Sequence, residues 1–481
     1  MEHIRSKDSK QYPGALTNEN ICKIFADAGD FNIRQLRCGK HLLWLYAIDG
    51  LTSGGDISEY VIWPVMTTLS GKTMQELYDN AILGGVYNSV AKPCEDLGQA
   101  ATFLVNGFCV LLFPGVGAVA FEVKTGEKRG INAPDLENTT KGPKDSFVET
   151  IRTNTSLIRR HIRTPDLRIH ETTVGKRSLT NVSVIWVDGL TNMGYVNRMK
   201  QRLDEIDIDG FLAPSAVEEY VTGSRTTAFP LLQYTERTDR FCRGILNGRV
   251  GLLVDGLPVG YLAPVDIGYL MNSPEDLGRD YISASWVRIL RYGALFLGLL
   301  LPAILIALSM YHLNWVPEPL SGLIMKSREM APFSTALEVL GLLVAFELLQ
   351  ESGIHLPQSV GQAVSIVGGI VLGTAGVEAG LISPMALITV STAGICGFVL
   401  PNRDLAAAIR FWRFVVAGAA AVGGLGAVAA TLGFLVFHLS QLKSLDVPYL
   451  KFFESGLLRR RLVLRKYRPL HLKTQDIKNQ K

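Results

Sequence analysis

The stretch from Pro357 to Pro401 contains a single charged residue, Glu378, and glycine recurs along it. Two segments of about 20 residues each would cross the hydrocarbon core of a bilayer, and small residues let helices approach closely in lipid. The sequence therefore predicts a membrane domain. A carboxylate held between two such spans is costly, which makes Glu378 a candidate functional residue.

Charge divides the 481-residue chain into two parts, because residues 1 to 288 are mixed while residues 289 to 442 are almost wholly apolar. This length predicts more than one domain, and a net charge of +4 indicates no nucleic-acid partner. The first ten residues lack the apolar core of a signal peptide, so the soluble part is expected in the cytoplasm. Six scattered cysteines favour a reducing compartment and predict neither structural zinc nor disulfides.

Two segments of the soluble part repeat each other. Residues 39–52 resemble residues 175–191, and residues 106–112 resemble residues 247–253 at nearly the same offset. Each copy contains an apolar strand ended by Asp-Gly, then a helical stretch, then a pair of strands joined as a hairpin. The sequence predicts two related α/β lobes with mixed sheets, followed by a multi-pass helical membrane domain.

The aspartates of the two Asp-Gly pairs, Asp49 and Asp188, could bind a ligand, although turn chemistry alone accounts for both. A helix predicted before Pro165 is basic at its end, which suits either anionic lipid or a solvated surface.

The predicted domains follow from these changes in composition, with a linker that is polar and rich in glycine and proline. They are a first α/β lobe at 1–123, a linker at 124–144, a second α/β lobe at 145–285, a transmembrane domain at 286–442 and a basic cytoplasmic tail at 443–481.

A cluster of polar residues near the end of the second lobe can form internal pairs. It contains Tyr234, Glu236, Arg237, Asp239 and Arg240. Such a cluster fixes a domain junction more often than it performs chemistry, so we interpret it as a junction motif.

Charge predicts the topology, because Arg288 and Arg291 precede the first apolar segment and the tail is basic. Both ends are then cytoplasmic and the number of crossings is even. The predicted crossings are 292–311, 359–377, 381–400 and 414–442. Two features conflict with this scheme: residues 332–351 are also apolar enough for a pore-lining or interfacial helix, and three arginines (Arg403, Arg410 and Arg413) fall on the predicted outer side.

Short motifs in the second lobe and the apolar part resemble the GerA family, the A subunits of bacterial spore germinant receptors. The motifs lie in family order at residues 142–144, 147–149, 157–160, 174–177, 229–230, 234–237, 273–276, 356–357, 360–362, 366–369, 382–384, 400–402 and 447–450. Thr238 follows the fourth residue of the 234–237 motif, where the family would have proline, and the first lobe matches more loosely.

The resemblance implies a multi-pass protein of the spore inner membrane, with its N-terminal domain and C-terminal tail on the core side. Its implied partners are a transporter-like B subunit, a lipoprotein C subunit, membrane lipid and further copies of the same chain, with no cofactor. The implied function is an oligomeric, nutrient-gated cation channel that starts germination. An accessory channel of the stage V sporulation protein AF type is the alternative within the family.

The residues themselves favour a channel over two other classes. No catalytic motif such as a nucleophile elbow or a P-loop occurs, so an enzyme is not expected. A transporter is compatible with glycine-rich helices around an acid, but so few spans leave little room for inverted repeats. We therefore expect Glu347 and Glu351, together with Glu338 and Glu378, to line or gate a cation path. Alternatively, these acids face headgroups or pair with Arg403, Arg410 or Arg413.

Overall fold

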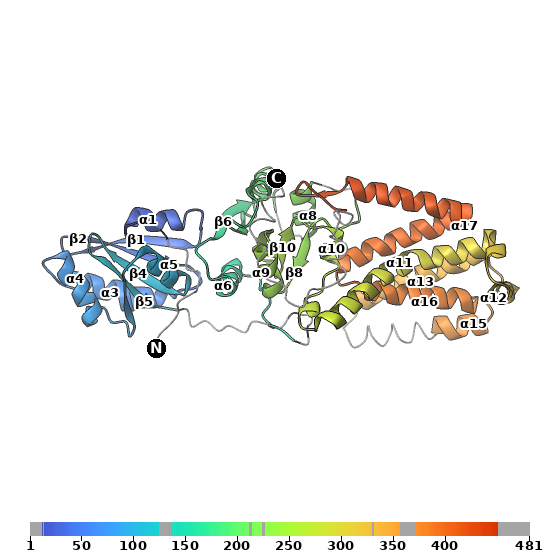
Figure 1. Ribbon diagram of the computed structural model, residues 1–481, viewed down its shortest axis with the longest axis horizontal. Coiled ribbons are helices and arrows are strands. Elements are labelled where there is room, and N and C mark those ends of the chain that lie inside the picture. The colour runs from blue at the N-terminus through green and yellow to red at the C-terminus, as the bar shows by residue number, and fades with distance from the viewer. Residues whose placement is uncertain are drawn as a thin grey trace. The chain divides into compact units, whose positions relative to one another are not determined.

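The computed structural model describes residues 12, 14–124, 134, 137, 139, 141–210, 214–223, 227–329, 331–355 and 371–450. The chain divides into two compact units (Figure 1). The α/β unit is Met1–Gly223 with Leu232–Pro264 and Pro469–Lys481, and the helical unit is Ser224–Leu231 with Val265–Arg468. The division after Pro264 precedes the boundary predicted at residue 285.

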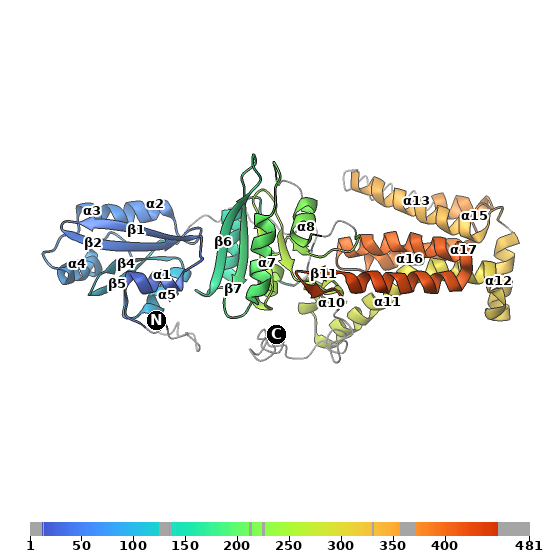
Figure 2. The same ribbon diagram turned by 90° about the horizontal axis from the view of Figure 1, so that it is seen from above.

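The first lobe of the α/β unit contains one five-stranded sheet covered on both faces. The strands lie in the order β1 (Phe31–Cys38), β2 (His41–Ile48), β4 (Phe108–Phe113), β5 (Gly117–Glu122) and β3 (Ala91–Cys94). Helices α2 and α3 lie on one side and α1 and α5 on the other, as Figure 2 shows. The helices of this lobe are α1 (Asn18–Ile24), α2 (Gly54–Ile57), η1 (Ser58–Ile62), α3 (Trp63–Thr67), α4 (Met74–Asn80), η2 (Ala81–Gly85) and α5 (Leu97–Val105).

The second lobe repeats this topology. Its strands lie in the order β6 (Leu167–Val174), β7 (Thr180–Val187), β9 (Val250–Val254), β10 (Gly260–Ala263) and β8 (Gln233–Thr235). The equivalent turn glycines adopt positive φ in both copies: Gly39 and Gly175, Gly50 and Gly189, Gly107 and Gly248, Gly115 and Gly256. The helices are α6 (Ile151–His161), α7 (Met193–Asp204), α8 (Pro214–Thr222) and α9 (Thr238–Leu246). Two related lobes, as the sequence predicted, are therefore present.

All strand pairings within these two sheets are antiparallel, where the sequence predicted mixed sheets. The reason lies in the connection through α5. Strands β3 and β4 run in the same direction on either side of that helix, but β5 lies between them in the sheet. The same holds for β8 and β9, with β10 between them. Parallel strands are thus present in each lobe without being neighbours.

A buried ion pair joins the two lobes. Arg159 on α6 donates from Nε to Asp30 Oδ2 at 2.7 Å and from Nη2 to Asp30 Oδ1 at 2.8 Å, and both side chains are 1% exposed. Its Nη1 donates to the Leu167 carbonyl at 3.0 Å. This two-pronged geometry satisfies both charged groups, as a buried pair requires.

The helical unit is built mainly from four long elements, α11 (Tyr281–Tyr311), α13 (Thr335–His355), α16 (Pro384–Phe398) and α17 (Arg403–Gln441). Among the described residues, α11 and α17 are long and apolar enough to cross a membrane. Most of the predicted span 359–377 lies outside the described residues. The shorter elements are α10 (Ile267–Leu270), η3 (Pro274–Leu277), η4 (Leu313–Trp315), α12 (Glu318–Glu329), η5 (Val371–Ala375), α15 (Gly376–Glu378), β11 (Lys443–Ser444) and β12 (Val447–Pro448).

Helix α17 is a hairpin and not the single span predicted at 414–442. Gly423 and Gly424 have non-helical backbone angles, and Gly424 has φ +60°. Trp412 and His438 are 26 residues apart, about 39 Å along a straight helix, yet their ring centroids are 6.1 Å apart. The residues on either side of the glycine pair, 403–422 and 425–441, therefore run back along each other (Figure 1).

The first half of α17 runs in the same direction as α11. Gly298 contacts Arg413, and further along both helices Tyr311 donates from its hydroxyl to the Ala421 carbonyl at 2.6 Å. The N-terminal ends of the two helices, with Arg288 on one and Arg403 on the other, therefore lie at the same end of the helical unit.

We predict that Gly424→Ala disrupts the α17 hairpin. A Cβ there would lie 3.1 Å from Tyr311 Cβ, and the backbone angles favour glycine. The apparent unfolding midpoint of the full chain in detergent should fall by about 5 °C or more. Gly418→Ala is the matched control, since a Cβ there has no atom within 4 Å. Equal midpoints for the two variants would contradict the hairpin.

Candidate functional site

Glu338, near the start of α13, is held against the start of α16. Its Oε2 accepts from the Ser383 hydroxyl at 2.6 Å and from the Ser383 main-chain N–H at 3.2 Å, and the residue is 5% exposed. Ser383 is the N-cap of α16 and itself accepts from the Ala386 N–H. A carboxylate at a helix N-terminus is favourable for the helix dipole. The structure therefore gives Glu338 a definite contact between two helices.

Glu347, two and a half turns further along α13, lies beside the first half of α17. Its Oε1 is 3.0 Å from Arg410 Nη1, and Arg410 also hydrogen bonds to Gln350. Glu351 and Glu378 are exposed in the isolated chain. The four predicted acids thus have different surroundings, and the pairing of Glu347 with Arg410 is one that the sequence left open.

Arg413, one turn after Arg410, is buried at the crossing of three helices. Its Nε donates to the Gly298 carbonyl of α11 at 2.6 Å and its Nη2 to the Ala393 carbonyl of α16 at 2.9 Å. Charged groups inside an apolar unit are costly unless such partners are supplied.

A second arginine cluster lies at the start of α11, where the sequence had used Arg288 and Arg291 for the topology without predicting their partner. Asp276 Oδ2 accepts from Arg288 Nε at 3.1 Å and from Arg291 Nη1 at 2.8 Å, and all three side chains are buried. The two arginines are three positions apart and so share one helix face. That spacing, together with the acids after Pro274, was the available signal.

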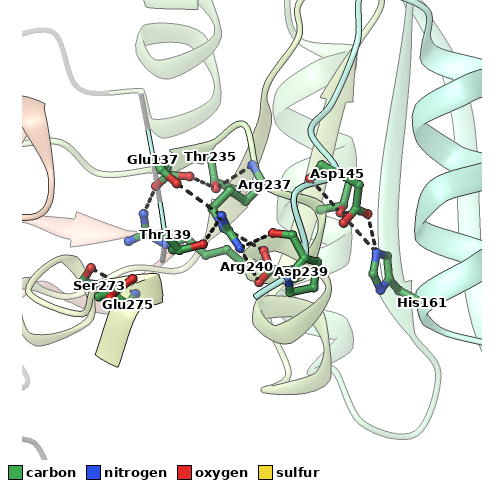
Figure 3. Close-up of polar contacts among 12 residues, drawn as sticks. Glu137, Thr139, Asp145, His161, Thr235, Arg237, Asp239, Arg240, Ser273 and Glu275 are labelled. Carbon is green, nitrogen blue, oxygen red and sulfur yellow. Dashed lines mark hydrogen bonds and ion pairs between the residues drawn. The ribbon is translucent and has the colours of Figure 1, made fainter. Parts of the chain in front are cut away.

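The junction motif binds the segment between the lobes to the second lobe, as Figure 3 shows. Arg237, 1% exposed, donates from Nε and Nη2 to the two carboxylate oxygens of Asp239 at 2.9 Å each. It also donates to Thr139 Oγ1 and to the Pro143 carbonyl, each at 2.9 Å. The Glu137 carboxylate accepts from Thr235 and Arg240.

The neighbours of Arg237 take part in the same attachment. The Glu236 carbonyl accepts from the Phe147 N–H at 2.7 Å, and Tyr234 pairs with Tyr261 in the register of β8 and β10. These contacts hold residues 137, 139, 143 and 147, the first three of which lie in the predicted linker.

Asp145, His161 and Thr238 form a small polar cluster beside this motif. His161 Nε2 is 2.7 Å from Asp145 Oδ2, and the buried Thr238 hydroxyl donates to the same carboxylate. The His161 hydrogen bond lowers the pKa of Asp145 to about 2 and raises the pKa of His161. Thr238 is 0% exposed and hence shielded from any substrate, so the arrangement suits structure and not nucleophilic catalysis.

We predict a pH-dependent stability of this attachment. A raised His161 pKa contributes stability that is complete below the unfolded pKa of about 6.5 and is lost as pH rises through the folded value. The free energy of local opening at the Phe147 amide, measured by hydrogen exchange corrected for intrinsic rates, should therefore fall from pH 6 to pH 8. His161→Gln should remove this slope, and the control His170→Gln should keep it. Equal slopes in wild type and His161→Gln would contradict the assignment.

The family model and the similar proteins with a known name all point to spore germination proteins. The family model for the Bacillus/Clostridium GerA spore germination protein matches residues 19–469. The chain is similar to spore germination protein KA of Bacillus subtilis (32% identical over 444 residues, 90% of this chain and 80% of that protein). It is similar to spore germination protein A1 of the same organism (34% over 361 residues, 75% of each). It is also similar to YfkQ, an uncharacterized membrane protein of B. subtilis (32% over 434 residues, 90% and 84%).

Among solved structures, the N-terminal domain of the A subunit of the Bacillus megaterium spore germinant receptor GerK3 is 26% identical. The structural match covers 51% of this chain and 91% of the solved chain, with a TM-score of 0.40. The family model spans nearly the whole sequence, from the first lobe to beyond the α17 hairpin. The chain therefore belongs to the GerA family of spore germination proteins.

Proposed function

We propose that this chain is the A subunit of a spore germinant receptor and forms, with copies of itself, a nutrient-gated cation channel in the spore inner membrane. Family membership supports the role in germination, since relatives such as spore germination proteins KA and A1 carry that name. The channel and the oligomer are argued below from the helical unit.

The exposed face of α13 carries the proposal. Val344 and Leu348 are 49% and 66% exposed, as expected of a surface that meets lipid or another helix. Glu351 is exposed near the same face, and the Glu347 side chain is 44% exposed. Carboxylates on such a surface are costly in lipid, so water or a second subunit should cover them. A ring of these acids from identical subunits would attract cations and repel anions.

The proposed orientation places the N-terminal ends of α11 and the first half of α17 towards the spore core. Arg288 and Arg291 on α11, and Arg403, Arg410 and Arg413 on α17, lie towards these parallel ends. The positive-inside rule then favours the core side for both groups. In this proposed orientation the α17 arginines would no longer conflict with the rule, because the first half of α17 runs parallel to α11.

The proposed partners are a transporter-like B subunit and a lipoprotein C subunit, which would supply the nutrient pocket or its access. In this arrangement the α/β unit and the C-terminal tail face the core, and the two lobes gate or assemble the channel. The junction motif around Arg237 would keep the segment between the lobes fixed while they do so.

We predict that Glu347→Gln combined with Glu351→Gln slows nutrient-triggered cation release. Each carboxylate removed from a partly hydrated path costs a passing cation about 1 kcal/mol, so the loss of both should slow release about 30-fold. Release is measured from spores that carry the variant at wild-type protein level.

Two controls separate the path from mere ion pairing. Arg410→Gln breaks the pair with Glu347 but leaves both carboxylates, so release should not slow comparably. Glu318→Gln removes an exposed acid of α12 and should have no effect. Normal cation release in the double Gln variant would contradict the proposal that Glu347 and Glu351 line the cation path. A slowing that is equal for all nutrients would favour an accessory channel.

A further inference from the structure

Pro302 interrupts the hydrogen bonding of α11. It lies inside this 31-residue helix and is buried. In a regular helix the Gly298 carbonyl would accept from the N–H of residue 302, but proline has no N–H and its ring crowds that carbonyl. A main-chain carbonyl without a partner is costly in an apolar interior, where water cannot replace the lost bond.

Arg413 supplies the missing donor. Its Nε lies 2.6 Å from the Gly298 oxygen, and the arginine is 5% exposed. The same guanidinium donates from Nη2 to the Ala393 carbonyl at 2.9 Å, so one side chain of α17 binds α11 and α16 together.

Glycine at position 298 allows the close approach of α11 to α16 beside this contact. A Cβ on Gly298 would lie 3.3 Å from Cys396 Cβ and 3.5 Å from Arg413 Nη2, and a Cβ on Gly397 would lie 3.6 Å from the same nitrogen. Small residues at a helix crossing allow the close approach that the hydrogen bonds need.

A buried arginine is usually paired with a carboxylate. On α17 it is the neighbouring arginine, Arg410, that has such a partner. Arg410, on the preceding turn of α17, pairs with Glu347 of α13. The two hydrogen bonds described for Arg413 both go to main-chain oxygens. Its chemistry therefore matches a free carbonyl better than an ion pair.

We propose that Arg413 is a positioning residue that replaces the amide missing at Pro302 and fixes the register of α11 against α16 and α17. Helix α11 follows the α/β unit in the chain, and Arg410 lies one turn from Arg413. A shift of α11 would therefore reach Glu347 on α13 through a single turn of α17. This last step rests on the proposed channel function, whereas the positioning role does not.

The test is a double-mutant cycle in the full chain. Arg413→Met keeps an apolar stem but removes the donors, and Pro302→Ala restores an N–H for the Gly298 carbonyl. Arg413→Met alone should lower the apparent unfolding midpoint in detergent by about 5–10 °C, and by less than half as much in the Pro302→Ala background. Arg413→Lys, with one ammonium, should recover part of the loss.

Pro384→Ala is the matched control background, because Pro384 stands at the first position of α16, where its N–H would have no helical acceptor. Arg413→Met should there retain its full penalty. Additive penalties in the Pro302→Ala background would overturn the proposal.

Cation release from spores tests the transmission step separately. Arg413→Met should slow release, and the added Pro302→Ala should restore it. If the unfolding midpoints show coupling between Arg413 and Pro302 but Arg413→Met spores release cations normally, the transmission step is contradicted. The positioning role is then still supported.

Discussion

Polar groups inside the helical unit must find partners within the chain, because apolar surroundings offer no water to replace them. Each buried charge described there meets this constraint by joining separate elements. Arg413 binds the carbonyls of two other helices, Glu338 accepts from the start of α16, and Asp276 holds two arginines of α11. The arrangement of the helices thus depends on a few polar contacts within extensive apolar packing.

The sequence predicted the lobes well because their signals are local. Apolar strands ended by Asp-Gly, and the repeated Asn-Gly after a helix, identify strand ends and turns before any contact is known. Strand order was less accessible, since the placement of β5 between β3 and β4 depends on how a crossover closes in space. For that reason the central strands of each sheet were recoverable (β2, β4 and β5, and β7, β9 and β10), whereas the four edge strands β1, β3, β6 and β8 were missed. Neighbouring strands pair antiparallel where mixed sheets were predicted.

The sequence predicted the acids of the candidate site but not their partners, because the two residues of each contact lie far apart in the chain. The acids of α13 are visible in an apolar stretch, but Ser383 and Arg410 lie far along the chain. The α17 reversal was missed because Gly423 and Gly424 fall within a run of small apolar residues that reads as one helix. From the sequence, Arg413 was noted as a charge on the predicted outer side of the membrane, without its link to Pro302.

The duplicated lobes place two copies of one scaffold in the same molecule. A Cβ on Gly107 would approach the Leu51 carbonyl oxygen to 3.1 Å, and one on Gly248 would approach that of Leu190 to 3.3 Å. These positions share their backbone conformation and this neighbour, while the rest of their surroundings have diverged. Each lobe is therefore an internal reference for the other, because the effects of equivalent substitutions in both can be measured in one molecule at the same temperature, solvent and concentration. A difference between equivalent substitutions isolates what the neighbours contribute from what the scaffold itself requires.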